Sequence, residues 1–201
     1  MSAYWFRCHE EYDKLCSAFA ETVEAAGKGE LEFEDENTVD AKMAKLLLLD
    51  QLSRNCFRGT PKAYSFDAIA QLLVREIAPP LVRTMEQPAD IPSIGPSIEQ
   101  LKGEFYPPYI SFIITALTHS EQMEDHELCQ QLLQRAVETS PPHLHVYFEG
   151  EEQAELVRKE ILQRFGRYPH RNRTLGRFST PEEEAWLGNE NELPEWARRK
   201  S

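Results

Sequence analysis

The chain has 201 residues, and its 34 acidic and 22 basic side chains give it a formal net charge of −12. This balance argues against nucleic acid and anionic membranes as partners, because both bind broad basic surfaces. A hydrophobic content of 41% is typical of an ordinary globular protein, and we expect residues 1–201 to form a single domain.

The lack of recognisable sorting signals and the pattern of cysteines indicate the cellular compartment that we expect for this protein. The N-terminus lacks the apolar run of a signal peptide, and no apolar stretch approaches the roughly 20 residues of a membrane-spanning helix. The cysteines at positions 8, 16, 56 and 129 show neither C-x-x-C pairing nor metal-ligand spacing. We therefore expect a cytoplasmic protein with reduced thiols and no membrane partner.

The first half of the chain shows helical periodicity. Apolar residues recur every fourth position from Leu15 to Val23, and the glycines at 27 and 29 end this first helix. A second helix is expected to begin at an N-cap, Asn37 or Thr38, and to run through four leucines toward Cys56. A third helix is expected to stop at Pro79-Pro80, because proline removes a donor and clashes with the preceding turn.

The second half begins with a proline-rich stretch, residues 79–108, that we expect to be a loop or lid. Helices are expected over residues 109–117, around 128–133 and over 149–165. The series Thr180-Pro181-Glu182-Glu183 predicts a helix start with a capping box.

No segment alternates with a two-residue period, so strands are not expected. The predicted fold is all-α, with roughly six to eight helices, no significant sheet and a short C-terminal tail over residues 189–201.

The densest positive charge lies near the C-terminus. Five arginines (164, 167, 171, 173 and 177) and His170 occur between Ile161 and Thr180, without an acidic residue. Gly166 suits a helix C-cap, and Pro169 prevents the helix from continuing. Guanidinium groups on such a rigid turn could bind the carboxylate or phosphate of a small molecule, or they could form an internal ion-pair network.

Two further motifs could contribute to the same site. Asp50, Arg54 and Arg58 are spaced by four residues and share one helix face, where the bland interpretation is a tie to a neighbouring helix. His119 could move protons near neutral pH, with Glu121 orienting it or acting as the base. The alternative for this second motif is an ordinary helix start after Ser120.

The histidines do not suggest a metal site. His119 and His126 are seven residues apart, but no H-E-x-x-H or similar motif is present. We therefore expect neither a metal nor a cofactor.

Three segments taken together resemble the family catalogued as domain of unknown function 924. They are Leu49–Thr60, His119–Glu121 and Phe165–Thr180. The resemblance implies a helical architecture of tetratricopeptide-like antiparallel helix pairs, and the family has no general activity assigned. This chain carries His126 where the family tends to have glutamine, and Arg158 where it often has histidine.

The leading hypothesis is a pocket for a small anionic metabolite, most consistent with an enzyme of unknown reaction. The acid–base candidates are His119, Glu121 and His170. The ligand-binding candidates are Asp50, Arg54, Asn55, Arg58, Arg167, Arg171, Asn172 and Arg177. The alternative is a tetratricopeptide-like adaptor for a peptide or protein partner, in which the cluster is only structural.

The arginine segment needs counterions from elsewhere in the fold. We expect a salt bridge from an acid of the other two motifs, Asp50 or Glu121, to an arginine at position 167, 171 or 177.

Overall fold

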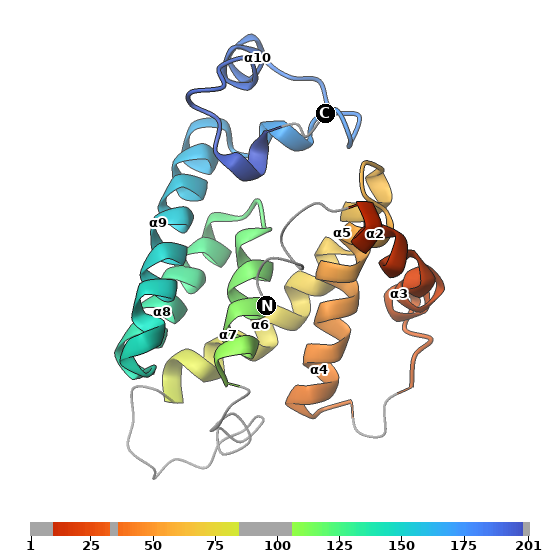
Figure 1. Ribbon diagram of the computed structural model, residues 1–201, viewed down its shortest axis with the longest axis vertical. Coiled ribbons are helices and arrows are strands. Elements are labelled where there is room, and N and C mark those ends of the chain that lie inside the picture. Colours follow the sequence, from red (N-terminus) through yellow and green to blue (C-terminus); the bar gives the residue numbers. More distant parts are fainter. Residues whose placement is uncertain (1–9, 33–35, 85–105, 199–201) are drawn as a thin grey trace.

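The computed structural model describes residues 10–32, 36–84 and 106–198, and over these residues the fold is all-α without strands. The all-α prediction is therefore confirmed (Figure 1). The elements in chain order are α2 (Glu10–Cys16), η1 (Ser17–Phe19), α3 (Ala20–Lys28), α4 (Val39–Leu46), η2 (Leu47–Leu52), α5 (Ser53–Cys56), η3 (Pro61–Tyr64), α6 (Asp67–Thr84), α7 (Tyr106–Thr118), α8 (Met123–Thr139), α9 (Pro142–Phe165), η5 (Pro169–Arg171), α10 (Pro181–Leu187) and η6 (Glu195–Ala197).

The helix ends follow the expected capping chemistry. The backbone of Gly29 is left-handed, with φ of 73°, where the α3 helix ends. The Thr38 side chain accepts a hydrogen bond from the backbone N–H of Ala41 and begins α4. Thr180 and Glu183 form the reciprocal capping box of α10.

Helix α6 does not stop at Pro79-Pro80, so the predicted start of the loop at residue 79 is wrong. The helix continues to Thr84, and residues 106–108 of the expected loop belong to α7. Val74, Ala78 and Val82 form one buried ridge across the prolines. The φ angle of proline suits a helix, and the apolar burial of this ridge offsets the lost donors. Residues 85–105 lie outside the described part.

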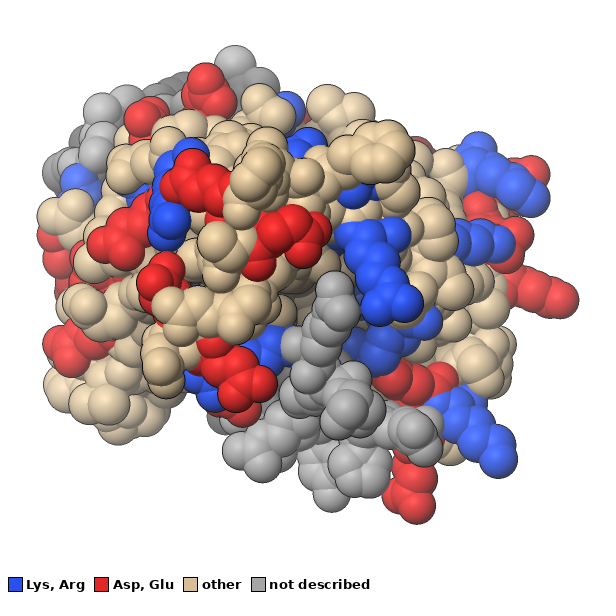
Figure 2. Space-filling view, turned by 90° about the horizontal axis from the view of Figure 1, so that it is seen from above, with Lys and Arg blue, Asp and Glu red and all other residues tan. Residues whose placement is uncertain are grey.

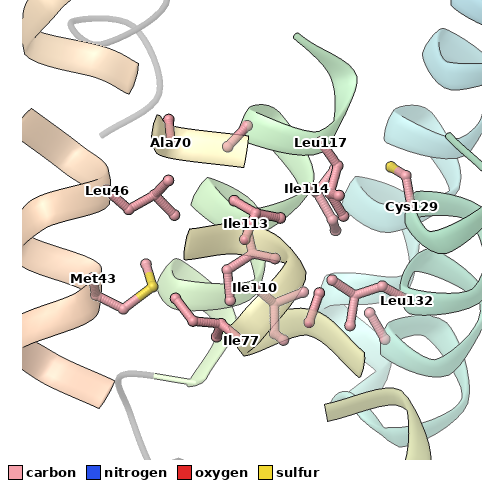
Figure 3. Close-up of a cluster of buried hydrophobic side chains, with 14 of the residues drawn as sticks. Met43, Leu46, Ala70, Ile77, Ile110, Ile113, Ile114, Leu117, Cys129 and Leu132 are labelled. Atoms are coloured by element: carbon pink, nitrogen blue, oxygen red, sulfur yellow. The ribbon is translucent and has the colours of Figure 1, made fainter. Parts of the chain in front are cut away.

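The main core lies between α4, α6, α7 and α8 (Figure 3). Met43 and Leu46 of α4 face Ile110 and Ile113 of α7, while the far side of α7 meets Leu132 of α8. Helices α8 and α9 are joined only by Ser140-Pro141 and pack along one another, as antiparallel neighbours must. The core thus fixes the position of the end of α7, which His119 follows directly.

A second, smaller cluster lies at the end of α9, where α10 is also found (Figure 1). Its buried members are Ile161, Leu162, Tyr168, Trp186, Leu193 and Ala197. Residues 189–198 of the expected tail therefore pack against the fold through Leu193 and Ala197.

Cys16, Cys56 and Cys129 are free thiols. No helix in the described residues has both the length and the apolar content to cross a lipid bilayer.

Candidate functional site

The helix that carries Asp50 changes its hydrogen-bond pattern at the site. Residues Leu47–Leu52 form the π-helical segment η2 between α4 and α5. Ser53 Oγ donates to the carbonyl oxygen of Leu49 at 2.6 Å, and Arg54 Nη1 donates to that of Asp50 at 2.8 Å. Such wide turns are rare and occur frequently at functional sites.

Asp50 and His119 form a buried pair across 69 residues of sequence. His119 Nδ1 lies 2.9 Å and 3.0 Å from the two carboxylate oxygens of Asp50, which is 1% exposed. Burial alone would raise the pKa of Asp50, but the charge of Arg54 and the His119 contact hold that pKa well below its usual range. The ionised carboxylate therefore accepts the Nδ1–H, and Nε2 carries the lone pair of the ring.

His119 is held in its neutral form. Burial lowers the pKa of its imidazole first, and the charges of Arg54 and Arg171 lower that pKa further. Asp50 opposes this shift without reversing it. A neutral imidazole fixed by a carboxylate at Nδ1 is the usual arrangement of a general base.

A cavity of about 180 Å³ lies beside this pair. Four arginines and two histidines line it, and no acidic residue is among its lining residues in the described part of the chain. Of the residues expected to bind or react, Arg54, Arg58, His119, His170 and Arg171 meet there. The other lining residues are Gly59, Ala63, Tyr64, Thr118, Arg158, Tyr168 and Trp196.

Three buried nitrogens from residues lining this cavity lack a hydrogen-bond partner within residues 10–32, 36–84 and 106–198. They are Arg171 Nε, Arg158 Nη1 and His170 Nδ1. A buried donor without a partner costs about 1–3 kcal/mol, more for a charged group. The cavity is therefore suited to a ligand that accepts hydrogen bonds.

Arg54 and Arg171 differ in how well they are paired. Arg54 donates to Asp67 Oδ2 at 3.0 Å and lies 3.1 Å from Asp50 Oδ1, so two acids neutralise its positive charge. Arg171 is 6% exposed, and among the described residues it has a long ion-pair contact to Asp67, at 3.6 Å, and contacts with the faces of two tyrosines. Burial and the charge of Arg54 lower the pKa of Arg171, so an added anion would be stabilised there.

Glu121 attaches the arginine segment to the end of α7. Its carboxylate accepts the backbone N–H of Tyr168 at 2.9 Å and two hydrogen bonds from Arg177, at 2.7 Å and 3.0 Å. Arg177 also donates to the carbonyl oxygen of Tyr168. The expected salt bridge between the motifs is thus Glu121–Arg177, and Asp50 is not part of it.

Three of the residues expected to bind the ligand do not line the cavity, because their side chains pair within the fold: Arg167, Asn172 and Arg177. Arg167 makes two hydrogen bonds to Glu183, at 2.7 Å and 2.8 Å, and these lower the pKa of Glu183 to about 2. Asn172 contacts both Glu183 and Arg177. Their polar groups are paired with acids that lie outside residues 161–180, Glu183 and Glu121.

Arg58 and Asn55 also differ from expectation. Arg58 makes two hydrogen bonds to Asp13 of α2 and one, from Nη2, to Asn55 Oδ1 at 2.6 Å. Arg58 still reaches the rim of the cavity, whereas Asn55 does not line it. Asp13 was not foreseen, because its helix lies 45 residues away in sequence.

Several cavity residues were missed by sequence analysis. Tyr64 and Tyr168 stack on the Arg171 guanidinium, with centroid distances of 5.1 Å and 4.8 Å. Trp196 lies under the Arg158 guanidinium at 5.4 Å. Of these residues, Arg158 was singled out by sequence analysis, because the family resemblance implies a histidine at that position.

The second departure, His126, lies close to Arg158. His126 and Glu155 are both fully buried, with Nδ1 2.5 Å from Oε1, and His126 Nε2 lies 2.9 Å from the carbonyl oxygen of Ser120. His126 Nε2 also lies 3.4 Å from the hydroxyl of Tyr168. Glu155 is three residues before Arg158 on α9, and its contact with His126 fixes that part of the helix.

The described residues contain no group of three His, Cys, Asp or Glu side chains placed to hold a metal ion. The face of the molecule that carries α10 shows basic side chains in scattered groups, interleaved with acidic ones (Figure 2). The positive charge of the site is therefore local.

The fold and site describe an all-α protein with a small, arginine-lined cavity. The family model described as "Bacterial protein of unknown function (DUF924)" matches residues 1–191, and the chain belongs to this family. It is also similar to a solved structure of a protein of unknown function from Agrobacterium tumefaciens, with 27% identity, a TM-score of 0.62, and coverage of 92% of this chain and 88% of that chain. No curated protein matches the chain.

We expect the Glu121–Arg177 pair to couple energetically. The two side chains are 22% and 23% exposed, between the surface and buried limits, so Glu121→Gln or Arg177→Gln should each cost about 1–3 kcal/mol in urea unfolding. The double variant should lose less than the sum of the single losses. Arg173→Gln, an exposed arginine in the same segment, is the control and should change stability by less than about 0.5 kcal/mol. Strictly additive losses would contradict the attachment.

We expect the free energy of unfolding to fall between pH 7 and pH 5. Burial, with the charges of Arg171 and Arg177, lowers the pKa of His170 from 6.5 to about 3. The unfolded chain therefore takes up a proton as pH falls through 6.5, while folded His170 does not until about pH 3, so stability decreases over this window. The lowered pKa of His119 acts in the same direction.

Chemical denaturation at pH 7, 6 and 5 measures this effect, above the range in which carboxylates titrate. His170→Gln should show a smaller decrease than wild type. A wild-type protein that is as stable at pH 5 as at pH 7 would mean that His170 is not held neutral.

Proposed function

We propose that the cavity binds the carboxylate or phosphate of a small metabolite and that His119 acts on it as a general base. The observation that carries this proposal is the meeting of two incompletely paired arginines with a histidine fixed by a buried carboxylate. Arg158 Nη1 and Arg171 Nε lack partners among the described residues, and His119 lines the same cavity. Guanidinium groups bind carboxylate and phosphate oxygens in the plane of their N–H bonds.

In the proposed mechanism the anionic group lies between Arg158 and Arg171. His119 Nε2 then takes a proton from the bound substrate or from a water molecule next to it. Asp50, which holds Nδ1–H, stabilises the imidazolium that forms. Arg54 lowers the pKa of His119, so the base is in its reactive form at neutral pH.

The assignment of roles differs from the first expectation for Glu121. Both of its oxygens accept hydrogen bonds from Arg177, and these bonds and the Tyr168 N–H lower its pKa although burial opposes the shift. A carboxylate saturated in this way is a poor base. The proposal therefore gives Glu121 a positioning role and gives the base to His119.

The adaptor alternative expects a fully paired structural cluster. A purely structural network would gain stability by pairing each buried donor. The unpaired nitrogens of Arg158, His170 and Arg171 in the described structure favour a binding site over that alternative.

We expect small anions to stabilise the protein through this cavity. Thermal unfolding with inorganic phosphate and a panel of small carboxylates should give a rise in Tm for wild type and for Arg173→Gln. The rise should be lost, or reduced at least tenfold in apparent affinity, in Arg171→Gln and Arg158→Gln, because each removes a charged donor. Each variant is compared with its own ligand-free Tm, which removes any effect on the fold itself. Equal stabilisation of all four proteins would refute the cavity as the binding site.

We expect His119 to carry its proton on Nδ1 at pH 7. Long-range ¹H–¹⁵N NMR spectra distinguish the two tautomers and the imidazolium. The His119 signal should show an unprotonated Nε2 in wild type, and Asp50→Asn should disturb this preference because the amide can also donate to Nδ1. A protonated Nε2 at pH 7 would exclude His119 as the base.

A further inference from the structure

A second, larger cavity adjoins the first. Its volume is about 550 Å³, and it shares three lining residues with the arginine-lined cavity: Tyr64, His119 and Arg171. The proposed base and the buried arginine therefore border both spaces. Its remaining walls come from α6 and from the segment that follows α7, including Gln71, Leu72, Arg75 and Glu121.

Gln71 presents an unused acceptor at this cavity. The side chain is 6% exposed, and its Nε2 donates to the carbonyl oxygen of Ala116 at 2.7 Å. That bond fixes the orientation of the amide, and Oε1 is left buried without a partner among the described residues. A buried amide oxygen of this kind is normally paired, so it calls for a donor that the described residues do not supply.

Apart from Arg171, the charged side chains that line the second cavity have ion-pair or hydrogen-bond partners. Arg75 makes two hydrogen bonds to Asp125, both at 2.7 Å, and Glu121 is held by Arg177. Asp67 is ion-paired with Arg54. Two buried oxygens of this lining have no hydrogen-bond partner among the described residues, Asp67 Oδ1 and Gln71 Oε1, and of these only Asp67 Oδ1 has an ion-pair contact, to Arg54.

The sizes of the two cavities indicate how one ligand would use them. Ligand pockets usually measure about 300–1,000 Å³, and the arginine-lined cavity is below this range. It can hold an acidic group with a few neighbouring atoms, whereas the second cavity is within the range. A ligand bound by its acidic group would extend past His119 into the second cavity.

We propose that the ligand is bifunctional, with a carboxylate or phosphate in the arginine-lined cavity and an N–H or O–H donor on Gln71 Oε1. This inference rests on the proposed function, because it assumes that the first cavity holds the acidic group. It places the bond or proton on which His119 acts between the two ends of the ligand. The substrate class is therefore small amino or hydroxy acids, or their phosphate counterparts.

Matched pairs of probes test this inference. NMR titration compares butyrate with 4-aminobutyrate and 4-hydroxybutyrate, and methyl phosphate with phosphoethanolamine, on wild type, Gln71→Met and Gln122→Met. Gln122 is exposed and lines the same cavity, so it is the matched control. In wild type and Gln122→Met the donor-bearing probe should bind about tenfold more tightly than its plain partner. In Gln71→Met this gain should vanish, while the plain acids keep their affinity.

The outcomes separate this inference from the proposed function. Plain acids that bind without any gain from the donor would overturn the bifunctional ligand and leave the anion site standing. A gain that persists in Gln71→Met would also overturn it. Failure of every probe to bind wild type would overturn both proposals. Since the comparison of probes in wild type needs no variant, it decides even if Gln71→Met does not fold.

Discussion

The hydrogen bonds of the Glu121 carboxylate create the site by joining two distant parts of the chain. Glu121 follows the end of α7, and it accepts both the backbone N–H of Tyr168 and the guanidinium of Arg177. His170 and Arg171 line one cavity with His119, although 47 residues separate Glu121 from Tyr168 in sequence. The backbone contact fixes the position of the turn, and the side-chain contact fixes its orientation. The cavity between the segments depends on both.

The arginines near the site fall into two classes, those paired with acids and those with an unpaired nitrogen. Asp50 and Asp67 neutralise Arg54, and Glu183 neutralises Arg167, so these pairs are structural and nearly complete. Arg158 and Arg171 keep unpaired nitrogens beside the cavity. Because no acid is among the described residues that line the arginine-lined cavity, the cavity is locally cationic although the protein has a net negative charge. This division supports the proposed anion site and explains why the whole-chain charge of −12 does not exclude it.

His126 and Arg158 are connected through helix α9. His126 pairs with Glu155 on α9, one turn before Arg158, and Arg158 stacks on Trp196 at the cavity. A buried pair that needs both partners fixes the helix on which Arg158 stands.

The sequence by itself determined the helical class, the caps at Thr38 and Thr180, the turn after Gly166 and the three motifs that meet. These follow from local periodicity, capping chemistry and the left-handed Gly166 that ends α9. Only the tertiary structure decided which arginines are free, because pairing depends on acids such as Asp13, Asp67 and Glu183 that are remote or outside the motifs. The same holds for the run of α6 through Pro79-Pro80, where burial of a ridge outweighs the local preference of proline. Local rules fix how each segment folds, and the competition for buried partners decides what each charged side chain can do.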